Sequence, residues 1–138
     1  MELFTIGYGG REPRDLVAIL VRNDIQTVVD VRLRPDRAYS GAFVKARSAD
    51  RGIEKTFSDA TITYRSLPEL GNIFLEHEDW ESPYKRLLQL AGELLTRRLL
   101  ELPTPICLLC AERDPARCHR ALIAEYLSQQ GWQVTHIE

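Results

Sequence analysis

The sequence predicts an α/β fold, a single three-layer domain in which a mostly parallel five-stranded sheet is flanked by helices. Three observations favour this class. Short β-rich segments alternate with longer amphipathic segments along the whole chain. The segment 27–31 is almost entirely apolar, which is typical of a strand covered by helices on both faces. The length of 138 residues fits one domain, residues 1–138, and leaves no room for two complete cores.

Five short segments are rich in apolar, β-branched or aromatic residues, a composition that favours strands. These expected strands are residues 3–6, 27–31, 61–65, 106–110 and 132–137. Pro103 and Pro105 stop the preceding helix just before the fourth segment, and glycine-rich residues 7–10 end the first.

The longer segments have apolar residues at helical spacing, which predicts helices that pack one face against the sheet. These expected helices are residues 12–23, 82–100 and 114–130, with a less regular helix over 43–58 that breaks near Gly52. Asp114 and Pro115 form a helix start signal, and Gly131 suits the helix end. Four aromatic residues are expected in the core or in a lid: Tyr39, Phe43, Trp80 and Tyr84.

The composition excludes a disordered or low-complexity protein, since 44% of residues are hydrophobic and 28% are charged. The net charge of −2 gives no support to nucleic-acid or membrane binding through overall charge. The 18 basic residues include only three lysines, Lys45, Lys55 and Lys85. Because the arginine guanidinium is a planar fork that matches carboxylate and phosphate, this bias favours a small anionic ligand.

The three cysteines cannot all pair with one another, which favours a reducing compartment. The first residues lack a basic region followed by an apolar stretch, and no apolar run approaches 18 residues. We therefore expect a cytoplasmic protein with no membrane partner, and we expect no cofactor.

Polar residues gather at the expected ends of the strands. Because the carboxyl ends of parallel strands meet at one edge of a sheet, residues far apart in the sequence should meet there around a ligand. The candidate ligand-binding residues are Tyr8, Asp30, Arg32, Glu69, Arg113, Arg117 and Arg120.

The segment 110–120 is the densest in reactive side chains, with two cysteines, one histidine, three arginines and two acids. If Asp114 caps a helix, Cys118 falls in or just after its first turn, where the helix dipole and nearby arginines lower a thiol pKa. Cys118 or Cys110 would then be a nucleophile, with His119 or Glu112 transferring protons. Alternatively, these cysteines are small buried core residues, and that interpretation suits Cys107 best.

A zinc site is the competing interpretation, because Cys107, Cys110, Cys118 and His119 supply four suitable ligands. Residues three apart in a strand point to opposite faces, so Cys107 and Cys110 should diverge. Neighbouring Cys118 and His119 should not converge on one ion from a helix. We therefore expect no metal site.

Two features resemble rhodanese-like domains: the segment Val29–Arg32 at the end of the second strand, and the cysteine that ends the fourth strand. We therefore expect a fold that is loosely rhodanese-like or flavodoxin-like. A phosphatase loop needs a cysteine and an arginine with five residues between them. From Cys110 that position is Ala116, and Arg117 comes one residue later. The sequence does not meet the phosphatase pattern.

Five motifs occur in order along the chain: Thr5–Tyr8, Val29–Arg32, Leu67–Gly71, Leu109–Glu112 and Cys118–Arg120. The set closely resembles the family known as domain of unknown function 488. Many members have His at the position of Tyr8, so no imidazole role transfers there. The resemblance implies one cytoplasmic α/β domain and supplies no reaction. It implies a site made of Cys110, Glu112, Cys118, His119, Arg120, Asp30, Arg32 and Glu69.

Three functions follow from these residues. The first is a pocket for a small anion at the carboxyl edge of the sheet, with catalysis by a cysteine. The second is a non-catalytic module that binds nucleic acid or an acidic partner. The third is a thiol redox sensor that uses Cys110 and Cys118. Whether the protein is an enzyme, and its oligomeric state, stay open at this stage.

Overall fold

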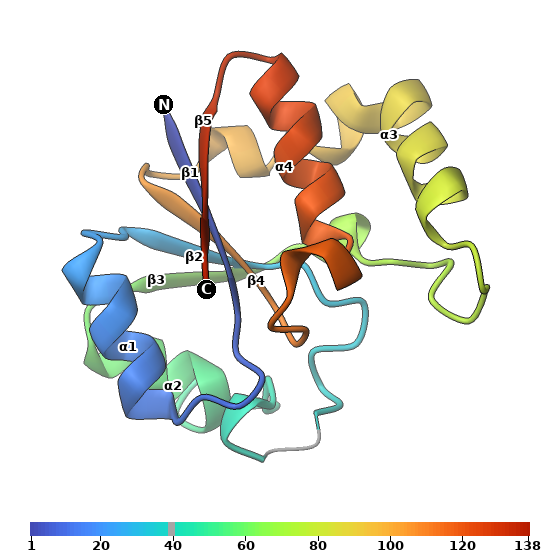
Figure 1. Ribbon diagram of the computed structural model, residues 1–138. Coiled ribbons are helices and arrows are strands. Elements are labelled where there is room, and N and C mark those ends of the chain that lie inside the picture. Colours follow the sequence, from blue (N-terminus) through green and yellow to red (C-terminus); the bar gives the residue numbers. More distant parts are fainter. Residues whose placement is uncertain (39–40) are drawn as a thin grey trace.

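The computed structural model describes residues 1–38 and 41–138, so the expected core or lid residue Tyr39 lies outside the described residues. Five strands alternate with four α-helices (Figure 1). The strands are β1 (Glu2–Gly7), β2 (Thr27–Asp30), β3 (Thr63–Ser66), β4 (Ile106–Cys110) and β5 (Gln133–Ile137). The helices are α1 (Pro13–Arg22), α2 (Gly52–Asp59), α3 (Glu81–Leu95) and α4 (Arg120–Gln129). Four short 3-10 helices are η1 (Gly41–Phe43), η2 (Pro68–Leu70), η3 (Leu99–Glu101) and η4 (Pro115–Arg117).

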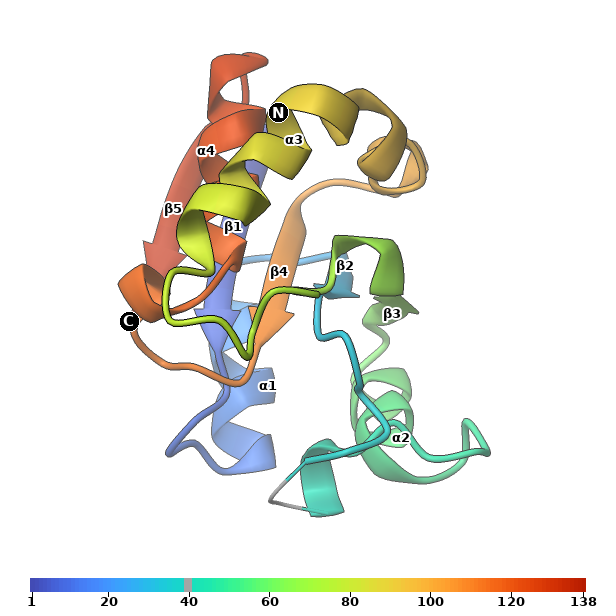
Figure 2. The ribbon, with the colours of Figure 1, turned by 90° about the vertical axis from the view of Figure 1, so that its right-hand side faces the viewer.

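The sheet has the order β3-β2-β4-β1-β5, and every neighbouring pair is parallel. Helices α1 and α2 cover one face and helices α3 and α4 cover the other, as Figures 1 and 2 show. The α/β class and the three layers are therefore confirmed. None of the described helices combines the length and the apolar character that crossing a membrane requires.

Two hydrophobic clusters hold the layers together. One joins the sheet to Leu16 and Leu20 of α1 and to Phe57 of α2. The other joins it to Tyr84 of α3 and Ile123 of α4. Both aromatic residues Tyr84 and Phe43 are buried in these clusters, whereas Trp80 is half-buried.

Strand β4 occupies the centre of the sheet, which explains why all five of its residues are buried. At its carboxyl end the Tyr8 amide donates to the carbonyl of Cys110 at 3.0 Å, and the Val31 amide donates to that of Leu109 at 3.1 Å. The chain leaves β1 toward one face and β4 toward the other. This divergence is the switch point at which open α/β sheets bind ligands.

The segment after β4 differs from the predicted single helix over 114–130. Asp114 caps only η4, where its side chain accepts from the Ala116 amide at 3.0 Å. The backbone is then extended at Cys118, with φ −131° and ψ 140°, and α4 begins at Arg120. Cys118 therefore follows the single turn of η4 directly, as predicted, whereas the continuous helix over 114–130 is wrong. Cys118 and His119 are buried at this break, with His119 against the Val31 carbonyl and both side chains lining the pocket described below.

Other helix boundaries also differ from the prediction. The segment 44–51 is not helical, and α3 ends at Leu95 before the separate short helix η3. Gly131 follows α4 with φ +98°, as expected of a glycine at a helix end.

Candidate active site at the carboxyl edge of the sheet

A pocket of about 320 Å³ opens at the carboxyl edge of the sheet, above the end of β4. Its walls come mainly from the loop after β2 and the loop between β4 and α4. It is lined by Tyr8, Arg32, Leu33, Arg34, Arg37, Ala38, Asn72, Leu75, Cys110, Ala111, Glu112, Arg117, Cys118 and His119. Seven of the predicted site residues are among these: Tyr8, Arg32, Cys110, Glu112, Arg117, Cys118 and His119.

The two cysteines lie together at the base of this pocket. Cys110 ends β4, and Cys118 returns to the same point through the extended break after η4. The sulfur atoms and a ring nitrogen of His119 all lie within 4.8 Å of one another. The three side chains are buried, so any chemistry here is shielded from bulk water.

His119 is fixed by a contact at each ring nitrogen. Its Nε2 lies 2.8 Å from the carbonyl oxygen of Val31, and its Nδ1 lies 3.8 Å from the Cys118 Sγ. A carbonyl oxygen can only accept, so Nε2 carries a hydrogen, and Nδ1 faces the sulfur, where it can accept the thiol proton and then donate to the resulting thiolate. The ring of Tyr84 packs edge-on against the imidazole at 5.2 Å between centroids. The arrangement is that of a nucleophile, a base and a group that orients the base.

The pKa values of the two thiols are shifted in opposite directions. Burial acts to raise the pKa of Cys118, but hydrogen bonds with Cys110 and His119 outweigh it and lower the pKa to about 4. The Arg120 amide, 3.5 Å from the Cys118 Sγ, also stabilises the thiolate. The hydrogen bond to Cys118, together with burial, raises the pKa of Cys110. The lowered pKa of Cys118 and the raised pKa of Cys110 favour a thiolate at Cys118 beside a thiol at Cys110.

Asp30 and Arg32 form a buried ion pair beneath the pocket. The Asp30 carboxylate accepts from Arg32 Nε at 2.9 Å and from Arg32 Nη2 at 2.6 Å, and the Tyr64 hydroxyl also donates to it. Arg32 Nη1 donates to the Tyr8 hydroxyl at 3.2 Å. Asp30 is fully buried and does not line the pocket. The pair holds Tyr8 in the pocket wall.

The pocket mouth carries excess positive charge. Arg34 pairs with Asp36 at 3.0 Å on the surface. Within the described residues, Arg37 and Arg117 line the pocket without a carboxylate within 4.0 Å. Glu112 is the acidic residue of the lining. An anionic ligand fits this charge pattern better than a cationic one.

The structure does not bring four of the predicted residues into this pocket, namely the buried Asp30 together with Glu69, Arg113 and Arg120. Glu69 forms a bidentate ion pair with Arg98, in which Nε and Nη2 of Arg98 each donate to a carboxylate oxygen at 2.7 Å. It does not line the pocket. Arg113 lines a neighbouring cavity. Arg120 is completely buried and donates to the carbonyls of Glu112 and Arg113, the latter at 3.0 Å.

Sequence reasoning missed several parts of the site. The Val31 carbonyl orients His119, but a backbone oxygen carries no residue-type signal. Asn72 and Leu75 reach the pocket from the loop after η2, and Tyr64 reaches Asp30 from β3. Only the position of these residues after or within predicted strands could have indicated them.

The three grouped side chains could also hold a soft metal ion such as zinc, with the pocket supplying a fourth position. Cys107 and Cys110 lie in different hydrophobic clusters on opposite faces of the sheet, as predicted. The expectation that Cys118 and His119 would not converge is wrong, because both residues precede α4 and the backbone at Cys118 is extended.

Comparisons with known proteins gave one match. The family model described as Domain of unknown function DUF488 matches residues 13–127. No curated protein and no solved structure matches the chain. The matched range contains the ends of β2, β3 and β4, together with Cys110, Cys118 and His119. The chain belongs to the DUF488 family.

Proposed function

We propose that the protein is an enzyme that uses Cys118 as a nucleophile on a small anionic substrate bound in the pocket above β4. The observation that carries this proposal is the position of His119, with one ring nitrogen facing the Cys118 sulfur and the other held by the Val31 carbonyl. A cysteine in a purely structural role needs no such partner.

The reaction class is group transfer or hydrolysis through a covalent intermediate. His119 Nδ1 takes the thiol proton, and the Cys118 sulfur bonds to the electrophilic atom of the substrate. The bond to the leaving group breaks, and His119 returns its proton to that group. Water or a second nucleophile then releases the transferred group from sulfur and regenerates the thiol. The guanidiniums of Arg37 and Arg117 make the pocket mouth positive and so attract an anionic substrate toward Cys118.

A redox sensor is the second candidate. The closeness of the Cys110 and Cys118 sulfurs favours it, because a sulfenic acid formed at Cys118 would meet a resolving thiol at once. Both candidates require a reactive Cys118 thiolate, and they differ in the fate of the oxidised or modified sulfur.

The experiment is alkylation by iodoacetamide at pH 7, with each cysteine followed by peptide mass spectrometry. We expect Cys118 to react first and faster than the thiol of free glutathione. His119→Asn should slow the reaction, and Cys107→Ala, which changes a cysteine on the other face of the sheet, should leave it unchanged.

Two outcomes overturn the proposal. One is a Cys118 rate no greater than that of glutathione. The other is stoichiometric zinc in the purified protein whose removal by a chelator is needed before Cys118 reacts, because the sulfur would then be a metal ligand rather than a nucleophile.

A further inference from the structure

A second cavity, of about 590 Å³, adjoins the first at the carboxyl edge of the sheet. It lies between the turn after β1 and the loop that follows β4. It is lined by residues 8–13, Ala42, Phe43 and residues 111–113. Tyr8, Ala111 and Glu112 line both cavities, so the two share a wall. The two cavities are therefore adjacent, and an elongated ligand that reaches past this wall would contact both.

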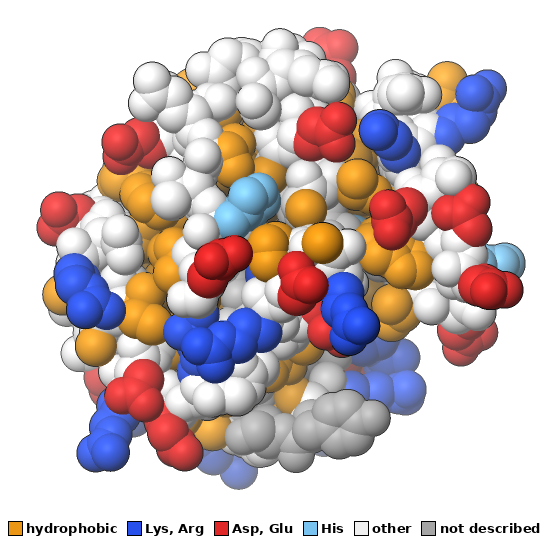
Figure 3. All heavy atoms as spheres, in the orientation of Figure 1, with side chains coloured by type: hydrophobic (Ala, Val, Ile, Leu, Met, Phe, Trp, Pro, Cys, Tyr) orange, Lys and Arg blue, Asp and Glu red, His pale blue; other side chains and the backbone are white. Residues whose placement is uncertain are grey.

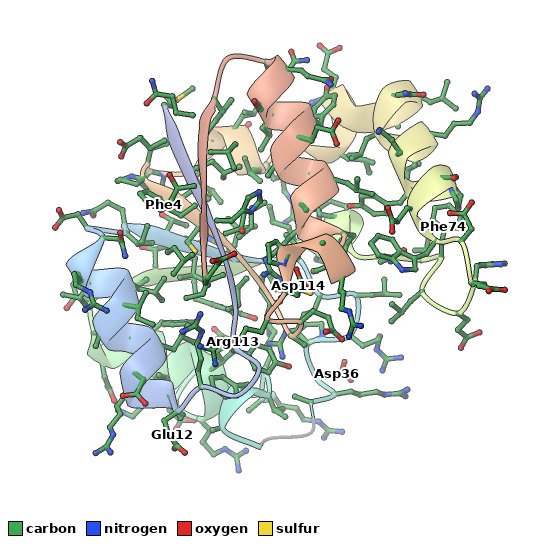
Figure 4. All side chains as sticks on the ribbon, in the orientation of Figure 1. Phe4, Glu12, Asp36, Phe74, Arg113 and Asp114 are labelled. Carbon is green, nitrogen blue, oxygen red and sulfur yellow. The ribbon has the colours of Figure 1, made fainter. Side chains whose placement is uncertain are left out.

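Two arginines, Arg11 and Arg113, line this second cavity. Arg11 leads into α1, and Arg113 lies on the loop between β4 and α4; Figure 4 labels Arg113 and, at the start of α1, Glu12. A terminal nitrogen of Arg113 lies 3.3 Å from the position that a Cβ on Gly10 would occupy. In Figure 3, basic side chains gather just beyond the end of β5, in the area where Figure 4 labels Arg113.

Arg120 adds a third positive charge behind these two. Burial lowers the pKa of Arg11, and the charges of Arg113 and Arg120 lower it further, so the three guanidiniums repel one another. The ion pairs found among the described residues, all within 4.0 Å, involve none of these three arginines. Glu12 and Glu112 also line the cavity, but both are exposed and neither pairs with these arginines.

The cluster also has unused donors. Arg11 gives its Nε to the carbonyl of Gly7 at 2.9 Å, but its Nη2 is buried with no hydrogen-bond partner among the described residues. Arg120 is completely buried, and its Nε likewise has no partner there. Buried donors without acceptors are costly, and clustered cations without anions add to that cost. An oxyanion between the guanidiniums of Arg11 and Arg113 would offer Arg11 an acceptor and would offset the clustered positive charge.

We propose that this second cavity binds a phosphate group between Arg11 and Arg113. Resting on the function proposed above, we further infer that the substrate is a phosphorylated small molecule whose phosphate lies here while its electrophilic atom faces Cys118. Arginine forks bind phosphate through paired charge-assisted hydrogen bonds. Gly10, with φ +71°, provides the space, since any side chain there would meet Arg113.

The first test is isothermal titration calorimetry, in which inorganic phosphate is added to the full chain at low ionic strength and the binding affinity is measured. Arg113→Gln should weaken binding about tenfold or more, because it removes a charge-assisted pair. No hydrogen bond from the Arg113 side chain is found among the described residues, so this variant should fold. Arg97→Gln, an equal change of charge at an exposed residue beyond α3, should leave the affinity unchanged.

The outcomes separate the two proposals. Cys118→Ser should bind phosphate normally, whatever the reactivity of Cys118. Absence of phosphate binding to the wild-type chain overturns the phosphate site and leaves the cysteine chemistry untouched. Loss of binding in Arg117→Gln with no effect of Arg113→Gln also overturns it, because the phosphate would then lie in the first pocket.

A second test joins the two cavities. N-(Bromoacetyl)ethanolamine phosphate carries a phosphate and an electrophilic carbon that a thiolate attacks with loss of bromide. We expect it to alkylate Cys118 at least about tenfold faster than its dephosphorylated analogue, in line with one charge-assisted pair. Arg113→Gln should remove this advantage and leave the rate with the analogue unchanged. Equal rates with the two reagents on the wild-type chain contradict a phosphorylated substrate.

Discussion

His119 holds its Nδ1 3.8 Å from the Cys118 Sγ while its Nε2 lies 2.8 Å from the carbonyl oxygen of Val31. The residue that orients the imidazole is thus 88 positions away in the sequence, at the end of β2. The contact ties the proton acceptor of the candidate site to the edge of the sheet, so its geometry depends on the fold and not on the loop alone.

The first prediction concerns the pH dependence of Cys118 reactivity. The thiolate is the reactive form and exists above the thiol pKa, which is lowered to about 4. The alkylation rate of Cys118 should therefore be nearly constant from pH 8 to pH 6 and fall only as the pH approaches 4. In His119→Asn the fall should begin at higher pH, because one stabilising hydrogen bond is lost. Rates measured by mass spectrometry that already fall tenfold per pH unit below pH 8 would contradict the lowered pKa.

The second prediction concerns oxidation. Peroxide oxidises the Cys118 thiolate to a sulfenic acid, and the Cys110 thiol then displaces water to form a disulfide. The sulfurs lie within 4.8 Å, so mild peroxide should lower the protein mass by two hydrogens and link these two cysteines. Cys110→Ser should instead accumulate sulfenic acid that dimedone traps. Cys107 should stay reduced, since it is completely buried on the other face. Free thiols at both positions after treatment would contradict the prediction.

The sequence predicts the central strand well and the start of the last helix poorly. Residues 106–110 are all apolar and follow Pro105, so one interpretation fits them, and β4 has these bounds. Asp114 and Pro115 also act as predicted, but they start a single turn of η4. The helix stops there because Cys118 and His119 are buried against the sheet. This burial depends on tertiary contacts, which the local sequence does not indicate.

Part of the candidate site could likewise be predicted from the sequence, and part of it could not. Cys110, Cys118 and His119 could be expected together because the carboxyl ends of parallel strands meet. Glu69 follows the edge strand β3, yet its carboxylate pairs with Arg98. Arg98 follows α3, and its position relative to Glu69 could not be predicted from the sequence. The sequence therefore indicates which edge holds the site, and long-range pairs decide which side chains reach it.

The third prediction tests the buried pair beneath the pocket. Asp30→Asn leaves the Arg32 guanidinium buried without its carboxylate, which should lower the free energy of unfolding by about 3–5 kcal/mol. Asp36→Asn is the matched control, because it breaks the Asp36–Arg34 pair on the surface, and it should change stability little. Urea unfolding of both variants measures the difference. Equal stabilities would mean that the Asp30–Arg32 pair contributes no more than an exposed one.

The last prediction tests the close approach of the loop after β4 to the end of β1. A Cβ on Gly7 would lie 1.8 Å from the Glu112 carbonyl oxygen, a backbone atom held by the Arg120 guanidinium. Gly7→Ala must therefore push the loop away, lowering the free energy of unfolding by about 1–3 kcal/mol, a usual range for overpacking. The loop carries Cys110 at one end and Cys118 at the other, so Cys118 alkylation should slow as well. Gly41→Ala is the control, because a Cβ there meets no atom within 4 Å. Unchanged stability and alkylation in Gly7→Ala would show that the loop shifts without disturbing the cysteines, and the rigid support argued for the site would then be wrong.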